Sequence, residues 1–398
     1  MKKTKVLVTG GAGYIGSHTV VELYNAGYQP IIVDNLSNSS IDVLDGIEKI
    51  VGEKPIFEQI DCTDYSSLIS LFEKYKEINY AIHFAAFKAV GESVQKPLYY
   101  YNNNLVSLLN LIEVMNSRGK SSIVFSSSCT VYGQPAPEHL PVSEEAPLQP
   151  ATSPYGKTKQ MSEDILSDSV TAFEGNLDVI ALRYFNPIGA HPSAYIGELP
   201  LGVPQNLLPF VTQTAAGIRE ELNVFGNDYN TPDGSCIRDY IYVCDLAKAH
   251  VAAIERLKRL ATSKQVNNTN TLISSKEIDD PASQSSSKEI DDPASQSISK
   301  EIAESVKQGS VTAHNTRGVF EYYNLGTGKG LSVLEVIEAF KKANSVDVPY
   351  KIVDRRSGDV EQVWADPTKA NKVLNWSANT PLEEVMKSAW NWQQKLKH

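Results

Sequence analysis

Residues 9–16 read Thr9-Gly10-Gly11-Ala12-Gly13-Tyr14-Ile15-Gly16, and this glycine-rich turn decides the fold. It follows an apolar, β-branched stretch, Lys5–Thr9, and precedes a helical pattern over Tyr14–Ala26. Between a first strand and a helix, glycines allow a tight turn and let backbone N–H groups approach a pyrophosphate at the helix N-terminus. The turn therefore predicts a dinucleotide-binding site built on Gly10, Gly13 and Gly16.

The first half of the chain continues with alternating strand-like and helix-like segments. Further strands are predicted at Pro30–Val33, Ile56–Ile60, Ala81–Phe84, Ser122–Ser126 and Val179–Arg183, and further helices at Ser66–Tyr75, Leu98–Met115 and Pro154–Phe173. This alternation predicts an α/β fold of the Rossmann type, a doubly wound parallel sheet with helices on both faces and ligands at the carboxyl ends of its strands. We expect this first, cofactor-binding domain to span residues 1–185.

The texture changes from about Asn186, where proline and glycine interrupt the chain repeatedly. This change indicates a smaller C-terminal α/β domain over residues 186–398 that caps the strand ends. We expect residues 241–260 and 319–326 to pack back on the first domain.

One stretch resembles neither domain. Residues 274–285 read SSKEIDDPASQS, and residues 286–297 repeat them without change. Residues 261–316 contain no Phe, Trp or Tyr, so they offer little apolar surface to offset the entropy of ordering. We expect a disordered, low-complexity insertion between a helix over Tyr242–Leu260 and a strand over Phe320–Leu325. It is either a tail that binds a partner or an expanded loop without function.

Composition excludes several classes of function. The net charge is −10, whereas nucleic-acid binding needs a basic face. No run approaches the ~18 consecutive apolar residues of a membrane helix. The four cysteines are far apart in sequence, which argues against a disulfide framework or a metal cluster. We expect a cytoplasmic protein that binds no nucleic acid, membrane or metal.

Asp34 ends the second predicted strand, where a carboxylate accepts hydrogen bonds from ribose hydroxyls and repels a 2′-phosphate. The position therefore favours NAD over NADP. Asp61, at the end of the third predicted strand, is either close to the adenine or an ordinary turn residue.

The candidate acid/base is Tyr155, the only one of 19 tyrosines with a lysine four positions later. Pro154 can begin a helix, which places Tyr155 and Lys159 one turn apart on one face. A neighbouring ammonium and the positive nicotinamide ring both favour the phenolate, so we expect a usable acid/base at neutral pH.

Three serines, Ser126, Ser127 and Ser128, follow the fifth predicted strand directly. A hydroxyl at this strand end can hydrogen-bond a substrate oxygen beside Tyr155. Spacing alone leaves open which serine does so.

Together these motifs resemble the extended short-chain dehydrogenase/reductase superfamily. Four longer stretches are similar, within it, to the UDP-glucose 4-epimerases. They are residues 89–97 (AVGESVQKP), 182–192 (LRYFNPIGAHP), 225–229 (FGNDY) and 238–241 (RDYI). The resemblance covers the chain from Lys5 to about Trp392, apart from the repeat insertion.

The resemblance implies a role for each matching position. Ser128, Tyr155 and Lys159 are the implied catalytic residues. Besides these three residues and the glycines, the implied NAD contacts are Tyr14, Ile15, Asp34, Asn35, Leu36, Ser37, Asn38, Ser39, Asp61, Cys62, Phe84, Ala85, Ala86, Lys88, Asn103 and Phe185. The implied UDP-sugar contacts are Lys88, Ser128, Tyr155, Asn186, Asn206, Leu207, Asn223, Val224, Phe225, Arg238, Arg356, Asp359 and Val363.

The implied activity is interconversion of UDP-galactose and UDP-glucose through a 4-keto sugar with tightly bound NAD, as in galactose metabolism. A homodimer is implied as well, through the helices near Leu98–Met115 and Pro154–Phe173, although core burial explains their apolar stripes equally well. The alternative is a 4-epimerase of another UDP-sugar, a UDP-pentose or a UDP-uronate.

Three positions depart from the family pattern or distinguish its members. Cys129 stands where alanine is usual, and Phe87 where leucine is usual. Val363 is small where some relatives carry a tyrosine that crowds the sugar pocket, so we hypothesise that UDP-N-acetylgalactosamine and UDP-N-acetylglucosamine are also substrates.

A sugar-nucleotide dehydratase is disfavoured because Cys129 and Thr130 occupy the places of its acidic pair. A non-catalytic NAD sensor is disfavoured because the Tyr155 and Lys159 pair is kept.

Overall fold

The computed structural model describes residues 3–119, 121–277, 318–356 and 359–396. The chain divides into two compact units, residues 1–257 with 318–398, and residues 258–317. Of the second unit, residues 258–277 are described as the C-terminal part of helix α8 (Val243–Glu277). The pattern predicts the end of this helix at Leu260. The helix continues beyond Leu260 because residues 261–280 contain neither glycine nor proline, the residues that most disfavour a helix. Residues 278–316 of the predicted insertion lie outside the described residues.

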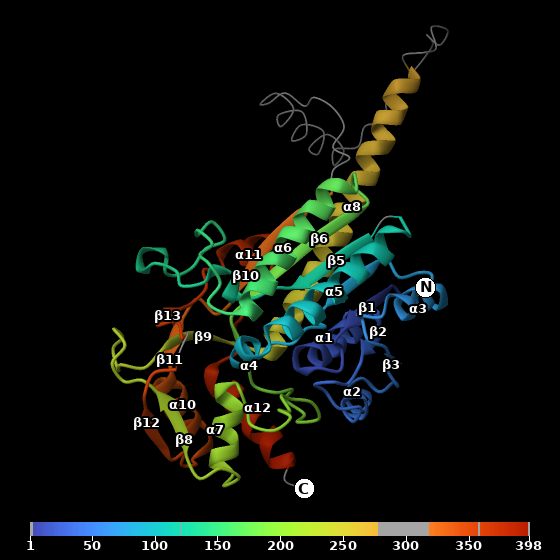
Figure 1. Cartoon of the computed structure of the whole chain (residues 1–398). Coiled ribbons are helices and arrows are strands. Elements are labelled where there is room, and N and C mark those ends of the chain that lie inside the picture. The colour runs from blue at the N-terminus through green and yellow to red at the C-terminus, as the bar shows by residue number, and fades with distance from the viewer. Residues whose placement is uncertain (1–2, 120, 278–317, 357–358, 397–398) are drawn as a thin grey trace, which may run out of the picture. The chain divides into compact units, whose positions relative to one another are not determined.

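A seven-stranded parallel sheet forms the centre of the first unit and confirms the Rossmann-type α/β prediction (Figure 1). Its strand order is β10-β6-β5-β4-β1-β2-β3. All the strands predicted from the sequence are present, with ends that move by at most two residues. Their bounds are β1 Lys5–Thr9, β2 Gln29–Asp34, β3 Ile56–Gln59, β4 Tyr80–His83, β5 Ser121–Ser126, β6 Leu177–Tyr184 and β10 Phe320–Leu325.

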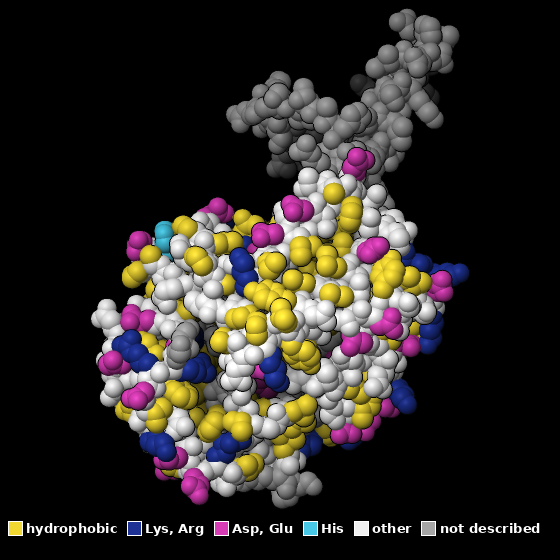
Figure 2. All heavy atoms as spheres, in the orientation of Figure 1, with side chains coloured by type: hydrophobic (Ala, Val, Ile, Leu, Met, Phe, Trp, Pro, Cys, Tyr) yellow, Lys and Arg dark blue, Asp and Glu magenta, His cyan; other side chains and the backbone are white. Residues whose placement is uncertain are grey.

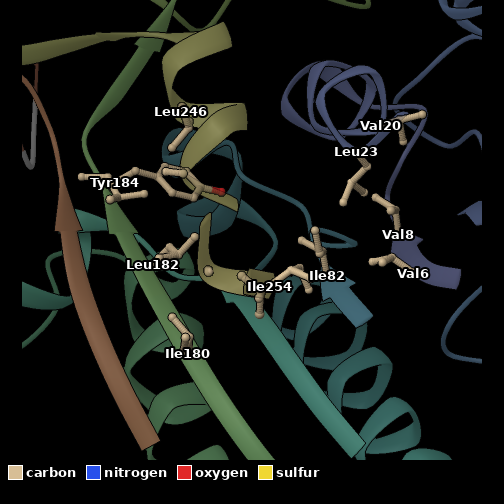
Figure 3. Packing of buried hydrophobic residues seen from close by; sticks show 14 of the residues in the cluster. Val6, Val8, Val20, Leu23, Ile82, Ile180, Leu182, Tyr184, Leu246 and Ile254 are labelled. Carbon is tan, nitrogen blue, oxygen red and sulfur yellow. The ribbon is translucent and has the colours of Figure 1, made fainter. Parts of the chain in front are cut away.

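Helices cover both faces of this sheet because successive strand residues point to opposite sides. On β1, Val6 and Val8 enter one apolar core and Leu7 enters the other. The first core holds α1 (Tyr14–Asn25), α2 (Val43–Val51) and α8. The second holds α3 (Tyr65–Lys74), α5 (Pro97–Asn116) and α6 (Pro154–Ala172). Figure 3 shows the first core, with Val8 beside Leu23 of α1 and Ile254 of α8 near Ile180 and Ile82.

Strand β10 follows residues 258–317 in the chain and yet pairs with β6, with Phe320 opposite Val179 and Leu325 opposite Tyr184. The buried side chains Leu246 and Leu257 of α8 belong to the same core as Val8. Strand β10 therefore extends the main sheet, and α8 packs on one face of it, although both come from the C-terminal half of the chain.

Most of the remaining elements of the first unit form a smaller group below this sheet in Figure 1. Four short strands make one sheet, β7 (Asn186–Ile188), β9 (Ile237–Tyr242), β11 (Gly330–Ser332) and β13 (Gln362–Val363). Strands β8 (Leu222–Phe225) and β12 (Tyr350–Val353) make a parallel pair. The helices of this group are α7 (Leu207–Ala215), α10 (Val333–Asn344) and α12 (Leu382–Lys395). Helix α11 (Thr368–Val373) instead lies beside β10, and its Ala370 belongs to the first core.

Two short helices lie at the carboxyl ends of the strands of the main sheet. Helix α4 (Val90–Gln95) follows β4, and the 3-10 helix η1 (Cys129–Tyr132) follows β5. A second 3-10 turn, η2 (Pro137–His139), comes next. Within the described ranges, the structure contains no helix with the length and apolar character needed to cross a membrane.

Candidate active site

The glycine turn between β1 and α1 has the geometry of a phosphate cradle. Gly10 has φ of +69°, and a Cβ at this position would lie 2.8 Å from the Ala85 backbone nitrogen. A Cβ at Gly16 would lie 2.3 Å from the Gly10 carbonyl oxygen, so both positions require glycine. A Cβ at Gly13 would meet only that oxygen, at 3.2 Å, among the described atoms within 4 Å. Space in front of the α1 N-terminus therefore stays open for a pyrophosphate.

Asp34 joins this turn to the loop that follows β2. One carboxylate oxygen accepts hydrogen bonds from the Leu36 N–H and the Ser39 hydroxyl, both at 2.9 Å. The other accepts from the Ala12 N–H at 3.1 Å. The predicted ribose ligand therefore lies beside the phosphate cradle, at the carboxyl end of the strand next to β1.

Asp61 is brought to the same edge, where its carboxylate accepts a 3.0 Å hydrogen bond from the Asn35 side-chain amide. Burial raises the pKa of Asp61, but hydrogen bonds from Thr63 and Asn35 outweigh burial and hold it below the usual value. The Cys62 side chain is buried in the core, so only its backbone is available to a ligand.

Three more of the predicted NAD contacts lie after β4, on α5 and after β6. Phe84 lies with its ring centre 4.7 Å from that of His250, and Phe185 is 3% exposed. The Asn103 side-chain amide donates to the side-chain oxygen (Oδ1) of Asn104 at 3.0 Å.

Lys159 is buried on α6, and its ammonium points at the three serines at the end of β5. Its Nζ donates a 2.7 Å hydrogen bond to the Ser126 carbonyl oxygen and lies 5.9 Å from the centre of the Tyr155 ring. Burial lowers the pKa of Lys159 to about 7, and the Glu163 carboxylate one turn further along acts in the opposite direction. Sequence reasoning missed Glu163, whose spacing of four residues from Lys159 was the available signal.

Tyr155 is 9% exposed, and in the protein alone its pKa is raised above the usual value. Burial raises the pKa of Tyr155 above the usual value, the Tyr184 phenol raises it further, and a hydrogen bond with the Ser128 side chain lowers it. The expected lowering has two sources, the Lys159 ammonium and a positive nicotinamide ring. The ammonium at 5.9 Å does not outweigh burial by itself.

The structure separates the three serines that spacing left equivalent. The Ser126 hydroxyl pairs with the Tyr184 hydroxyl, and the Ser127 hydroxyl donates to Glu163 at 2.5 Å. Ser128 is the one whose hydroxyl meets Tyr155, and it also accepts from the Thr130 N–H at 3.2 Å. The geometry thus groups Ser128, Tyr155 and Lys159 at the carboxyl end of β5.

Cys129 follows this serine directly. Burial raises the pKa of its thiol to about 11, and the charge of Arg238 acts against burial. The thiol is therefore protonated at neutral pH and takes the place of a small apolar side chain, not of a nucleophile.

Predicted UDP-sugar residues meet on the four-stranded sheet. Asn186 on β7 pairs with Tyr240 on β9, and Val363 on β13 pairs with Arg238 on β9. Val363 is 5% exposed and belongs to an apolar cluster that includes Phe185.

A second group of predicted UDP-sugar residues lies at the end of β8. The Arg356 guanidinium donates to the Asp359 carboxylate at 2.7 Å and lies 5.6 Å from the centre of the Phe225 ring. Asn223 is exposed on the same strand, whereas the Val224 side chain is buried, so only its backbone is available to a ligand. Ser357 and Gly358 lie outside the described residues.

A third group is held together by Glu198, which sequence reasoning missed. Its carboxylate accepts a hydrogen bond from the Asn206 amide at 2.5 Å and pairs with the Lys88 ammonium at 3.1 Å. Lys88 in turn lies 5.7 Å from the centre of the Tyr14 ring, in the first turn of α1. Leu207 follows Asn206 as the first residue of α7. Predicted cofactor and substrate residues therefore meet at one carboxylate.

Comparisons with known proteins agree with this arrangement. The model of a family described as NAD dependent epimerase/dehydratase matches residues 6–267, and one described as GDP-mannose 4,6 dehydratase matches residues 294–389. UDP-glucose 4-epimerase of Bacillus subtilis is 45% identical over 388 residues, covering 98% of this chain and 96% of that protein. UDP-glucose 4-epimerase of Dictyostelium discoideum is 44% identical over 389 residues, covering 98% and 95%.

A solved structure is equally similar along the whole chain. UDP-glucose 4-epimerase of Bifidobacterium longum, in complex with NAD+ and UDP, superposes with a TM-score of 0.80 at 41% identity and covers 98% of both chains. On this evidence the chain belongs to the NAD-dependent epimerase/dehydratase family and, within it, to the UDP-glucose 4-epimerases.

Proposed function

We propose that this chain interconverts UDP-galactose and UDP-glucose by inverting C4 of the sugar, using bound NAD. The observation that carries the proposal is the cluster of Ser128, Tyr155 and Lys159 at the carboxyl end of β5. The relatives support the proposal, because two UDP-glucose 4-epimerases match this chain at 44% and 45% identity over nearly their whole length.

The residues present fit NAD. The open space before the α1 N-terminus suits the pyrophosphate, and the Asp34 carboxylate beside it suits an unphosphorylated ribose. When bound, NAD supplies the reversible oxidation at C4 of the sugar. We assign its adenosine and pyrophosphate to residues 10–16, 34–39, 61 and 62, and its nicotinamide half to residues 84–88, 103, 159 and 185.

Tyr155 takes the proton of the sugar 4-hydroxyl and later returns it to the other face. Ser128 holds the same sugar oxygen by a hydrogen bond and, through its bond to Tyr155, keeps the phenol in place. Lys159, anchored on the Ser126 carbonyl, keeps a positive charge near the phenol and favours its phenolate. Together the three residues hold the 4-hydroxyl oxygen of the sugar and transfer its proton.

The diphosphate of the substrate requires cations on the opposite side of the site. Arg238 and Arg356 carry guanidinium groups with the fork geometry that grips a diphosphate. Both are already oriented, Arg238 by a 2.8 Å hydrogen bond to the Ile237 carbonyl oxygen and Arg356 by Asp359. Firm binding of UDP with looser binding of the hexose lets the 4-keto sugar turn and present its other face.

The identity of the sugar depends on the side chains that surround it. UDP-galactose and UDP-glucose are the substrates that the family supports best, and a UDP-pentose or UDP-uronate is the alternative on the same scaffold. Val363 leaves more room than a tyrosine does, so UDP-N-acetylgalactosamine is proposed as a further substrate.

We also propose that the chain acts as a homodimer in the cytoplasm. Apolar side chains are exposed along α4, α5 and α6, among them Val94, Leu98 and Tyr99, at 61%, 81% and 51%. Figure 2 shows yellow side chains gathered over this part of the surface. A shared apolar face of this kind suits a two-fold interface. NAD binding is assigned to residues 1–185 with 241–260 and 319–326, and UDP-sugar binding mainly to the rest of 186–398.

A proton NMR time course of the anomeric signals tests the activity. The purified protein is mixed with UDP-galactose and no added NAD. Growth of UDP-glucose to a stable mixture supports a 4-epimerase that retains its cofactor. Absence of conversion, even after NAD is added, contradicts the proposed substrate and directs the test to UDP-pentoses and UDP-uronates.

A further inference from the structure

Behind the catalytic cluster lies a buried network of charged and polar groups that the proposed proton transfers do not use. Glu163 on α6 accepts a 2.5 Å hydrogen bond from the Ser127 hydroxyl. Arg183 on β6 donates to both carboxylate oxygens of Glu163, from Nε at 3.0 Å and from Nη2 at 2.6 Å. Ser127, Glu163 and Arg183 are 0%, 6% and 3% exposed.

The network continues to the far end of the segment that follows β5. The Arg183 Nη1 donates to the Tyr132 hydroxyl at 3.0 Å, and this hydroxyl donates to the side-chain amide oxygen of Asn324 on β10 at 2.7 Å. Tyr132 is the last residue of η1, whose N-cap is Ser128. One guanidinium therefore acts on the start of this segment through Glu163 and Ser127, and on its end through Tyr132.

Successive turns of α6 contact successive residues of the same segment. Tyr155, Lys159 and Glu163 are spaced by four residues, which places them on one helix face. Lys159 bonds Ser126, Glu163 bonds Ser127, and Tyr155 bonds Ser128. The Glu163 bond is the only one of the three made by a group outside the proposed proton transfer, and it acts on the residue between the other two.

We propose that Glu163 and Arg183 are positioning residues of the epimerase, which clamp Ser127 so that the Ser128 hydroxyl and the Lys159 ammonium keep their places beside Tyr155. This inference rests on the proposed function for its kinetic consequences and on the hydrogen bonds above for its structural ones.

A purely stabilising role predicts a different outcome. A buried ion pair adds little net stability compared with well-packed apolar residues, because desolvation offsets most of the attraction. Proton transfer, in contrast, is sensitive to displacements of an ångström or less. If the clamp serves position, loss of the Ser127 hydroxyl changes kcat while the fold persists. If it serves stability alone, the melting temperature changes and kcat does not.

The decisive variant is Ser127→Ala, with Ser121→Ala as its matched control. Ser121 is a buried serine at the other end of β5, and its hydroxyl donates to the Asn176 carbonyl oxygen at 3.4 Å. For Ser127→Ala we expect kcat with UDP-galactose to fall about tenfold or more, since misplacement of reacting groups is costly. KM and NAD content stay unchanged, because the substrate and cofactor contacts are intact. For Ser121→Ala neither kcat nor KM changes.

A second variant, Glu163→Gln, separates charge from position. The groups that face Lys159 are Glu163 and Tyr155 on its own helix, and His83 on β4, whose buried imidazole is neutral. Loss of the carboxylate charge removes the influence that raises the pKa of Lys159. The descending alkaline limb of kcat against pH therefore moves to lower pH in Glu163→Gln and stays in place in Ser127→Ala.

Amide hydrogen exchange supplies a readout that does not depend on turnover. The Thr130 and Val131 N–H groups donate to the Ser128 hydroxyl and carbonyl oxygens, so their protection reports the order of this segment. We expect faster exchange in peptides covering 126–133 of Ser127→Ala and unchanged exchange there in Ser121→Ala. Unchanged exchange together with an unchanged kcat for Ser127→Ala overturns the clamp. If the parent protein does not turn over UDP-galactose, the proposed substrate fails, and the exchange comparison still decides the clamp.

Discussion

The Lys159 ammonium donates its hydrogen bond to the Ser126 carbonyl oxygen, 2.7 Å away, on the same strand exit that carries Ser128. This hydrogen bond to the backbone holds the positive charge of Lys159 in place near the Tyr155 phenol. Because Tyr155 lies one turn before Lys159, one strand end and one helix set the positions of all three proposed catalytic groups. This relationship underlies the first prediction.

Replacement of Tyr155 by phenylalanine removes the phenol and leaves the ring. General acid/base catalysis contributes about 10²–10⁴ in rate, and we expect kcat of Tyr155→Phe with UDP-galactose to fall about a thousandfold. NAD content stays at the parent value, because the cradle at residues 10–16 is untouched. Tyr350→Phe, at an exposed tyrosine of β12, is the matched control and keeps parent activity. Tyr155→Phe with near-parent kcat, by NMR of the anomeric signals, contradicts the assigned acid/base.

Asp34→Asn tests the cofactor assignment. Asparagine keeps one oxygen but replaces the other with an amide that cannot accept from the Ala12 N–H. Hydrogen bonds to charged acceptors contribute about 1.5–3 kcal/mol, so we expect NAD to bind about ten- to a hundredfold more weakly. NAD released from gel-filtered protein by denaturation is quantified by chromatography. Asp64→Asn, at the N-cap of α3, serves as the control and leaves NAD content unchanged, because asparagine caps a helix about as well as aspartate. Equal NAD content in parent and Asp34→Asn contradicts the assignment.

Three buried histidines predict that the protein is labile to acid. Burial lowers the pKa of His18, His83 and His250 to about 3, 3 and 4. Below the unfolded value of about 6.5 the unfolded chain binds protons that the native state does not, so stability falls as pH falls towards 4. The three together contribute a slope of up to about 4 kcal/mol per pH unit.

The measurement is the free energy of unfolding in urea at several pH values between 7 and 5, with saturating NAD throughout. His250→Phe removes one titrating group from a site that already packs against Phe84 and Tyr184. Its slope is expected to be smaller than that of the parent by up to about 1.4 kcal/mol per pH unit. Identical slopes in the two proteins contradict the neutral, buried state of His250.

Most of the main sheet could be predicted from sequence because each strand is an apolar run between turns, and burial on both faces is what such runs report. The glycine turn was equally informative. Gly10 has a positive φ, and a side chain at Gly10 or Gly16 would lie too close to neighbouring backbone atoms, so both positions require glycine. The end of α8 was not predictable, because the polar residues after Leu260 carry no apolar period, and the lack of helix breakers was the only signal.

Within the site, sequence placed Tyr155 and Lys159 on one helix face but did not predict that burial raises the pKa of Tyr155 in the protein alone. A linear pattern states which groups are neighbours along a helix, whereas burial depends on what covers them, here including Tyr184 from β6. Glu163 and Glu198 were missed for a related reason. Each meets a partner on another element that no local pattern connects to it, Arg183 and Ser127 for Glu163, and Lys88 for Glu198.

The side chain at position 363 is expected to determine which UDP-sugars the protein accepts. Val363 lies opposite Arg238 in the β13–β9 pair and is buried in a cluster with Tyr132 and Phe185. An N-acetyl group at C2 needs room that a bulky neighbour removes. Val363→Tyr is therefore expected to abolish turnover of UDP-N-acetylgalactosamine while turnover of UDP-galactose persists.

The added ring also overpacks the cluster, which typically costs about 1–3 kcal/mol, so the melting temperature is measured in parallel. Val363→Thr keeps the shape of valine, and it is expected to retain both activities. Conversion of the two sugars is followed by the same NMR assay, so each variant reports a ratio that a general loss of stability does not change. A parent protein that turns over UDP-galactose and leaves UDP-N-acetylgalactosamine untouched contradicts the proposed pocket, because the room left by Val363 is then not the room that the acetyl group needs.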